Sequence, residues 1–143
     1  AAERGASSSA RESLMDHVPR GLAALKRAQK LQKRAARAGF DWEGAGDVVP
    51  KIREELDELT EAMDAGAPGS RLEEELGDLL FSCVNLARHL RVDADMALRG
   101  ATTKFEARFR AMESALIADG TSVGEADIEV MEAAWSKAKS GAG

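Results

Sequence analysis

Two acidic segments contain the residues whose types and spacing are best suited to chemistry. Glu55 and Glu58 lie three residues apart in the first segment, and Glu75 and Asp78 repeat that spacing in the second. Apolar residues recur at intervals of three and four through both segments, which is typical of amphipathic helices. At about 100° per residue, each acidic pair lies on the same side of its apolar stripe, offset by roughly 60° and 120°. We call these four residues the acidic quartet.

The connection between the two segments is short and rich in glycine and proline, from Asp64 to Gly69. Such a connection favours an antiparallel hairpin of helices. When the apolar stripes of an antiparallel pair pack face to face, both acidic flanks lie on one side, whereas a parallel pair would separate them. The sequence therefore predicts that the carboxylates of the acidic quartet converge over one helix–helix seam.

Converging carboxylates repel one another unless a cation lies between them. Oxygen ligands suit hard cations, so the acidic quartet predicts a site for Mg²⁺, for which Mn²⁺ can substitute, and four acids can hold more than one ion. Mg²⁺ bound in this way keeps coordination positions for water and substrate phosphates. The alternative is a non-enzymatic helical module whose acidic faces serve only solubility or partner docking.

Composition narrows the class of protein. The 143 residues suffice for one domain, and with 4% aromatic residues and no tyrosine the core must be mainly aliphatic, which favours helices. A net charge of −5 argues against nucleic acid as a main partner, and no apolar run reaches membrane-spanning length. The single cysteine, Cys83, falls on an apolar stripe and is predicted to be buried. The lack of a disulfide framework favours a reducing, cytoplasmic location.

The patterns predict an all-α fold, with four main helices in a bundle-like arrangement and a short C-terminal helix. Residues 1–18 are rich in serine and alanine and are predicted to be a flexible tail or linker, followed by the domain at 19–140. Asp47 is expected to cap the second helix, and Ser70 with Glu73 to form a capping box for the third. The predicted helices span about 19–38, 47–65 and 70–92, then a fourth that is capped by Asp93 or Asp95 and reaches about 118, and a last one at about 125–139.

The first predicted helix has apolar residues on two sides, which indicates packing on both and favours a homodimer. The loop after it contains Phe40 and Trp42, which are expected to be apolar anchors, with stacking of Trp42 on a base as the alternative. The chain starts with Ala1 rather than methionine, so it is expected to be processed or a fragment.

Several catalytic arrangements are missing from the sequence. It has no Glu-x-x-His pair, no zinc-ligand spacing, no glycine-rich phosphate loop, and no serine or cysteine with an evident base partner. Phosphate chemistry would therefore depend on metal and carboxylate, with water as the nucleophile. Glu55 is the favoured general base and Glu54 the alternative.

Glu54-Glu55-x-x-Glu58 followed by Glu75-x-x-Asp78 resembles the EExxE…ExxD signature of the all-α nucleotide pyrophosphohydrolases. That superfamily includes MazG, the dimeric dUTPases and the phosphoribosyl-ATP pyrophosphohydrolases. The segments at 31–42, 73–90 and 104–109 resemble the C-terminal domain of MazG in particular. The resemblance covers residues 20 to 139, and it implies that the chain is the second of two tandem domains, preceded by the remains of a linker.

The resemblance implies hydrolysis of nucleoside triphosphates to the monophosphate and pyrophosphate, for housecleaning of the nucleotide pool or control of a nucleotide signal. It implies a homodimer, with Mg²⁺ bound by the acidic quartet. A dUTPase-like or phosphoribosyl-ATP-specific hydrolase is the alternative within the superfamily. The nucleotide contacts that it implies are Lys51, Glu54, Arg71, Glu74, Lys104, Arg108 and Trp135.

Overall fold

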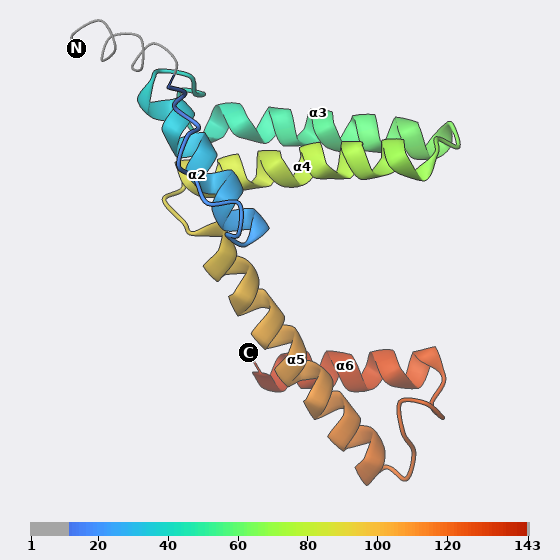
Figure 1. Ribbon diagram of the computed structural model, residues 1–143. Coiled ribbons are helices and arrows are strands. Elements are labelled where there is room, and N and C mark those ends of the chain that lie inside the picture. The colour runs from blue at the N-terminus through green and yellow to red at the C-terminus, as the bar shows by residue number, and fades with distance from the viewer. Residues whose placement is uncertain (1–11, 143) are drawn as a thin grey trace, which may run out of the picture. The chain divides into compact units, whose positions relative to one another are not determined.

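The computed structural model describes residues 12–142 of the chain, which form five α-helices and no strand (Figure 1). The all-α prediction is therefore confirmed for this part of the chain, and residues 1–11 of the predicted tail lie outside it. The helices are α2 (Ala24–Arg37), α3 (Ala45–Asp64), α4 (Gly69–His89), α5 (Ala94–Ala118) and α6 (Ile128–Ala142).

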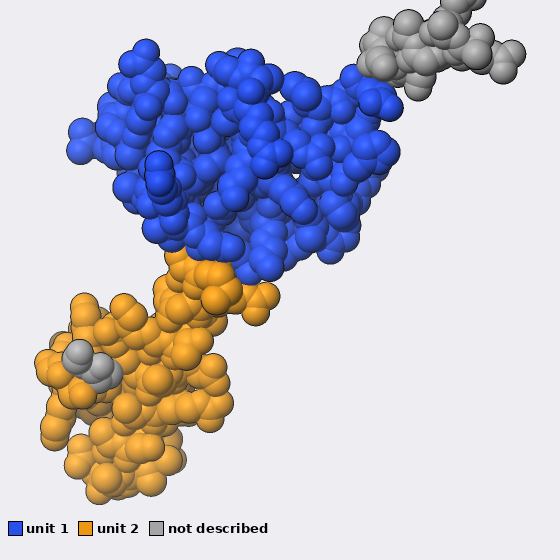
Figure 2. All heavy atoms as spheres, turned by 90° about the vertical axis from the view of Figure 1, so that its left-hand side faces the viewer, with its two compact units in different colours: residues 1–95 blue, residues 96–143 orange. Residues whose placement is uncertain are grey.

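The chain divides into two compact units, which are coloured separately in Figure 2. The first extends to Asp95 and contains α2, α3 and α4, and the second begins at Met96 and contains α6 and nearly all of α5. A four-helix bundle would require α5 to pack on the helices of the first unit. That part of the predicted architecture stays a prediction.

The helices α3 and α4 form the expected antiparallel hairpin and run side by side over their length (Figure 1). The turn between them depends on Gly66, whose φ of 67° is a left-handed conformation that glycine adopts without strain. Its amide donates to the Met63 carbonyl at 3.1 Å, and the Ala67 amide donates to the Ala62 carbonyl at 3.0 Å. This is a Schellman motif, which satisfies the last carbonyls of α3 and reverses the chain at once.

The other helix ends use the same motif. Gly39 ends α2 and Gly120 ends α5, with φ of 92° and 80°. Arg91 takes the glycine position after α4 with φ of 59°, which is uncommon for a residue with a side chain. The Val92 amide donates to the Ala87 carbonyl at 2.9 Å and fixes this turn.

Three predicted details of the helix starts are wrong. The first helix begins at Ala24 rather than near Pro19, because the backbone turns at residues 20–22. Gly44 is the N-cap of α3, so Asp47 lies inside the first turn, where its charge complements the helix dipole without capping. Pro68 is the N-cap of α4, and the predicted capping box of Ser70 with Glu73 does not form.

The buried faces of α3 and α4 are rotated from the predicted leucine stripes toward the acidic residues. On α3 the buried residues are Val48, Glu55 and Ala62, and on α4 they are Ser82, Val84 and Asn85. Some apolar residues of the predicted stripes are exposed and the others are only half-buried. Cys83 is exposed, although it was expected to be buried. Small and polar side chains fill the seam, and the apolar residues left outside it are Leu56, Met63, Leu76 and Leu80.

The helix α2 packs on α4 through two glutamine side chains. Gln32 is buried, and its Nε2 donates to the Phe81 carbonyl at 3.0 Å. Gln29 donates to the Val92 carbonyl at 3.2 Å and accepts from the Ala94 amide at 3.0 Å, so it clamps both sides of the turn after α4. Since both carboxamides bond to backbone groups far away in sequence, the two residues fix the position of α2 along α4.

The second unit has its own small apolar cluster. Met112 and Leu116 of α5 are buried, and the Phe105 ring lies 6.0 Å from that of Phe109 and 5.4 Å from that of Trp135. Asp127 begins α6, because its Oδ1 accepts from the Val130 amide at 2.9 Å.

Candidate functional site

Three members of the acidic quartet come together at the seam between α3 and α4. Glu55, Glu75 and Asp78 each offer a carboxylate oxygen, and these oxygens all lie within 4.8 Å of one another. Glu55 is buried with 6% of its surface exposed, Glu75 is half-buried, and Asp78 is exposed at the rim. The antiparallel hairpin thus joins residues that are twenty positions apart in sequence into one acidic site.

The two glutamates of this cluster each have a basic neighbour one helical turn earlier. Lys51 Nζ lies 2.9 Å from a Glu55 oxygen, and Arg71 Nη2 lies 3.7 Å from a Glu75 oxygen. The hydrogen bond to Glu55 raises the pKa of Lys51 above its ordinary value. These cations offset part of the negative charge, and both are residues for which the resemblance implies nucleotide contacts.

The fourth member of the quartet, Glu58, lies next to this cluster but outside its closest set of oxygens. The charge of Glu55 raises the pKa of Glu58, with further contributions from burial and from Glu75 and Glu54. A raised carboxyl pKa is the physical signature of like charges held close together. Glu58 therefore responds to the negative charge of the cluster, although it is not one of the three residues whose oxygens lie closest together.

Two oxygens of the cluster are buried without a hydrogen-bond donor. These are Oε2 of Glu55 and Oε2 of Glu75, one from each helix. A buried carboxylate oxygen without a donor costs free energy, because it has given up its water without replacement. A hard divalent cation between the helices would satisfy both atoms, so the residues present fit a Mg²⁺ or Mn²⁺ ion.

The remaining residues that the resemblance implies are divided between the two units. Glu54 and Glu74 are exposed on α3 and α4, and Glu54 lies 3.8 Å from Lys51. Lys104, Arg108 and Trp135 lie in the second unit, where Lys104 is exposed and Trp135 packs against Phe105. The Nε of Arg108 is buried without an acceptor in the described part of the chain.

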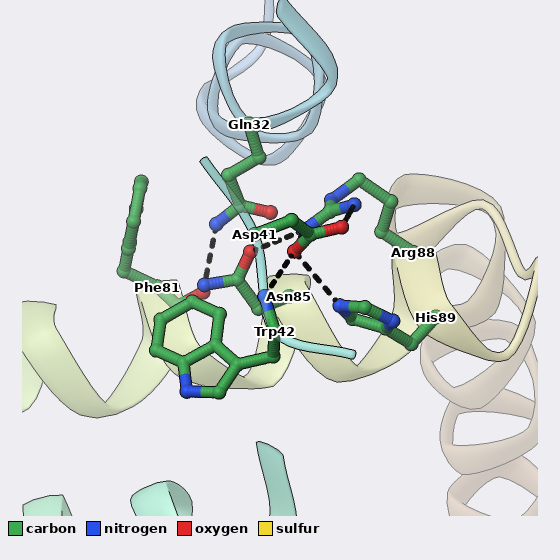
Figure 3. Close-up of polar contacts among 7 residues, drawn as sticks. All are labelled: Gln32, Asp41, Trp42, Phe81, Asn85, Arg88 and His89. Atoms are coloured by element: carbon green, nitrogen blue, oxygen red, sulfur yellow. Dashed lines mark hydrogen bonds and ion pairs between the residues drawn. The ribbon is translucent and has the colours of Figure 1, made fainter. Parts of the chain in front are cut away.

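A second polar cluster joins the loop after α2 to the last turns of α4 (Figure 3). Asp41 accepts from Arg88 at 2.9 and 2.6 Å through both guanidinium Nη atoms, and its Oδ1 also lies 2.9 Å from His89 Nε2. Arg88 Nη2 further donates to Asn85 Oδ1 at 3.1 Å. We call the contact of Asp41 with Arg88 and His89 the Asp41 clasp.

The Asp41 clasp stabilises the charged forms of Asp41 and Arg88, which are both partly buried. The hydrogen bonds from the Arg88 guanidinium hold the pKa of the Asp41 carboxyl far below its usual range, with a smaller contribution from His89. The same contact raises the pKa of Arg88. Bidentate pairs of this kind are stronger and more directional than single ion pairs, so the clasp anchors the loop on α4.

Anchoring the loop leaves its aromatic residues at the surface. Phe40 is 81% exposed and Trp42 is 38% exposed, so the expectation that both are apolar anchors is wrong for this chain. The anchor is Asp41, which lies between them and which sequence reasoning had not singled out.

A polar stripe on α4 is the sequence signal that marks Asn85 and His89, the residues near Asp41 that the sequence analysis did not single out. Glu75, Asp78, Ser82, Asn85 and His89 recur at intervals of three and four, so they share one helix face. Leucine spacing alone predicts the neighbouring leucine stripe as the buried face, because leucine is the usual residue of a buried helix face. In the structure Ser82 and Asn85 of the polar stripe are buried, Glu75 and His89 are half-buried, and Asp78 is exposed.

Comparison with known proteins identifies the family of this chain. Residues 45–112 match the MazG nucleotide pyrophosphohydrolase domain. The chain is 50% identical over 131 residues to a nucleoside triphosphate pyrophosphohydrolase of Escherichia coli (strain K12), covering 91% of this chain and 50% of that protein. It is 49% identical over 118 residues to a nucleoside triphosphate pyrophosphohydrolase/pyrophosphatase MazG of Thermotoga maritima, covering 82% and 45%.

The chain therefore belongs to the MazG family of nucleotide pyrophosphohydrolase domains, as its motifs had indicated. It spans about half the length of these two curated relatives. An uncharacterized protein of Bacillus subtilis, YabN, is 38% identical over 127 residues, which are 89% of this chain and 26% of that protein. Between residues 12 and 142, none of the helices combines the length and apolar character needed to cross a membrane.

The Asp41 clasp predicts a pH-dependent contribution to stability. Asp41→Asn should lower the free energy of unfolding by about 2 kcal/mol at about pH 6, since it removes a charged bidentate contact. Because the folded-state pKa of Asp41 lies below its ordinary value of 3.8, the stabilisation is complete above that value and is lost as pH falls toward the folded pKa. Urea unfolding should show a smaller difference between wild type and variant at about pH 3.

The matched control for this measurement is Glu106→Gln, which removes a carboxylate from an exposed pair with Arg110 on α5. Solvent screens such a pair, so the control should unfold like the wild type at both pH values. Equal destabilisation by Asp41→Asn at both pH values would contradict the role given to the Asp41 charge.

Proposed function

We propose that this chain hydrolyses nucleoside triphosphates to the nucleoside monophosphate and pyrophosphate, using Mg²⁺ or Mn²⁺ held by the acidic quartet. The observation that carries the proposal is the convergence of Glu55, Glu75 and Asp78 with two buried oxygens that lack donors. Membership of the MazG family and the printed names of the two bacterial relatives support the same reaction. The reaction suits a cytoplasmic enzyme of nucleotide housecleaning or signal control.

The metal would be held by Glu55, Glu58, Glu75 and Asp78. Once bound, it supplies positive charge at the phosphoryl oxygens and lowers the pKa of a water molecule. Glu55 is the residue we assign to remove the proton of the attacking water, because it is the most buried of the four, with Glu54 as the alternative. No covalent intermediate with the chain is required, since an in-line displacement needs charge stabilisation and a positioned water.

The lysine and arginine side chains near the site would bind the polyphosphate of the substrate. Lys51 and Arg71 already lie beside the two inner glutamates, and Arg108 has a buried nitrogen without an acceptor. Lys104 lies one helical turn before Arg108, so both project from one face of α5. We assign these four residues, with Glu54, Glu74 and Trp135, to substrate binding, as the family resemblance implies. In the balanced reaction, water adds to one phosphorus as the bond to the bridging oxygen breaks.

We further propose that the active form is a homodimer. Leu56, Met63, Leu76 and Leu80 are all at least 46% exposed on the hairpin of α3 and α4. Apolar side chains grouped on one pair of helices mark an interaction surface in a soluble protein. A second copy that covers this surface would complete an apolar core that the polar seam does not provide.

The metal assignment predicts that loss of an acid of the quartet lowers activity, whereas loss of an exposed acid outside the quartet does not. Asp78→Asn should lower pyrophosphate release at limiting Mg²⁺ by at least about a hundredfold, because it removes a ligand. It should leave the metal-free protein as stable as before or slightly more so, since it relieves repulsion between like charges. Glu58→Gln should also lower the activity, which tests the fourth ligand.

Asp57→Asn is the control, since Asp57 is exposed on α3 and lies outside the acidic quartet. It should leave activity and its Mg²⁺ dependence unchanged. Thermal melting adds a test that needs no turnover: Mg²⁺ with nucleotide should raise the melting temperature of the wild type but not that of Asp78→Asn. If Mg²⁺ and nucleotide leave the melting temperature of the wild type unchanged, the result would favour the non-enzymatic helical module.

The reaction assignment predicts the products. A panel of ribo- and deoxynucleoside triphosphates, with dUTP and phosphoribosyl-ATP included, should yield monophosphate and pyrophosphate and rank the substrate preference. In ¹⁸O-water, label in the monophosphate means attack at the α-phosphorus, and label in pyrophosphate means attack at the β-phosphorus. Orthophosphate and nucleoside diphosphate as primary products would overturn the proposed reaction.

The dimer assignment predicts the assembly state in solution. Sedimentation at micromolar concentration should give twice the mass of the chain, and Leu76→Glu should shift the protein toward the monomer because a buried charge would oppose association. Only monomer in the wild type would count against the dimer.

A further inference from the structure

The helix α2 carries a large share of the positive charge of this chain. Six of the 20 lysine and arginine residues lie in its 14 positions, and it contains no acidic residue, although the whole chain has a net charge of −5. Like charges one helical turn apart destabilise a helix, and Lys26 with Lys30 is such a pair. A bound anion would remove this repulsion.

The arginines and lysines of α2 differ in what they contact. Arg34 Nη1 donates to the Leu14 and Asp16 carbonyls at 3.1 and 2.9 Å, so it holds the segment that precedes the helix. Three lysines are exposed instead, and among the residues that the structure describes they form no ion pair or side-chain hydrogen bond. These three are Lys26, Lys30 and Lys33. Their positive charges are therefore available to a ligand.

The three lysines line one cavity of about 260 Å³ in the first unit. Its other walls are formed by Leu22, Gln29 and Asp93, so three cations face a single carboxylate and the lining is positive. None of these residues belongs to the acidic quartet or to the nucleotide contacts already assigned. We call this space the lysine cavity.

The spacing of the three lysines lets them act on one ligand. They lie at positions i, i+4 and i+7, so their side chains leave the same face of α2, in a row about 10 Å long. Lysine side chains are long and flexible, and their ammonium groups can converge on a compact anion. Gln29 contributes a fixed wall, because its carboxamide is held by the Val92 carbonyl and the Ala94 amide.

The size and chemistry of the lysine cavity favour a small phosphate-rich ligand. Pockets for drug-sized ligands begin at roughly 300 Å³, which is larger than this cavity. Its lining has no aromatic residue on which a nucleic-acid base could stack, and Leu22 is its one apolar residue, whereas protein interfaces centre on apolar and aromatic anchors. Lysine binds phosphate as a point charge and needs no further recognition group.

We infer that Lys26, Lys30 and Lys33 bind an oligophosphate, a chain of two or three linked phosphate groups, at a site separate from the acidic quartet. Free inorganic oligophosphate and the phosphate chain of a nucleotide share this chemistry. The lysine cavity needs no divalent cation, because its own side chains are positive, whereas the acidic quartet repels phosphate until a cation is bound. Binding here therefore does not depend on the proposed reaction.

Titration of the full chain with inorganic tripolyphosphate in EDTA tests this site. NMR signals of α2 around residues 26–33 should shift, and higher ionic strength should weaken the binding because it screens exposed charges. Lys30→Gln combined with Lys33→Gln should raise Kd roughly tenfold, since two charged contacts are lost. Both side chains are exposed, so the variant should fold like the wild type.

The matched control is Lys137→Gln combined with Lys139→Gln, which removes the same charge from two exposed positions of α6. It should change Kd by less than about twofold, because it alters only the net charge of the chain. Equal weakening by both double variants, or shifts confined to α5 and α6, would overturn the site. So would a lack of tripolyphosphate binding by the wild type in EDTA.

A comparison of ligands at matched phosphate number distinguishes the two sources. Equal Kd values for tripolyphosphate and ATP in EDTA would identify free oligophosphate as a sufficient ligand. Tighter binding of ATP that the lysine double variant still weakens would identify the phosphate chain of a nucleotide. Tighter binding of a glutamate-rich peptide or a single-stranded oligonucleotide than of tripolyphosphate would overturn the inference in favour of a macromolecular partner.

Discussion

Placing carboxylates inside a helix–helix seam is the constraint on which the rest of this structure depends. Glu55 is almost fully buried, and a buried anion is tolerated only when other charges or donors compensate for its lost water. Lys51 provides one such partner at 2.9 Å. The seam around Glu55 and Glu75 is otherwise acidic, and two of its oxygens lack donors. The acidic seam therefore costs stability, which a cation bound at the proposed site would restore.

One face of α4 connects the candidate sites. Glu75 and Asp78 lie toward its N-terminal half, and Asn85 and His89 follow on the same side. A rigid helix sets the spacing between such residues more accurately than a loop can. The loop after α2 is bonded to this end of α4 through Asp41, whose bidentate contact with Arg88 holds the neighbouring Phe40 and Trp42 in place.

The polar seam also explains why so much apolar surface remains exposed. Because acids and small residues occupy much of the face between α3 and α4, several leucines of both helices remain exposed. The hydrophobic effect still acts on them, because burial of each would be worth about 1.5–3 kcal/mol. If the seam between α3 and α4 holds acids for chemistry, the apolar residues outside the seam need another surface to cover them. This is the physical basis for the proposed dimer.

The sequence by itself determined the all-α class, the helical hairpin, the convergence of Glu55, Glu75 and Asp78, and the family. These follow from local rules: helical periodicity, the glycine and proline at the turn, and a motif with fixed spacing. The lengths of α3 and α5 were also close to prediction, because Gly66 and Gly120 end both helices. Family membership rested on matching segments, which need no knowledge of packing.

Only the tertiary structure decided which face of each helix is buried. Leucine spacing alone placed the seam of α4 roughly 100° away from the polar stripe that includes Ser82 and Asn85. The caps at Asp47 and Ser70 and the burial of Cys83 failed for related reasons, since small shifts of a helix start or of its rotation change the environment of each residue. Some buried polar side chains have a partner from a distant part of the chain, as Arg88 has in Asp41. That partner is not visible in local sequence, so the fold alone could reveal it.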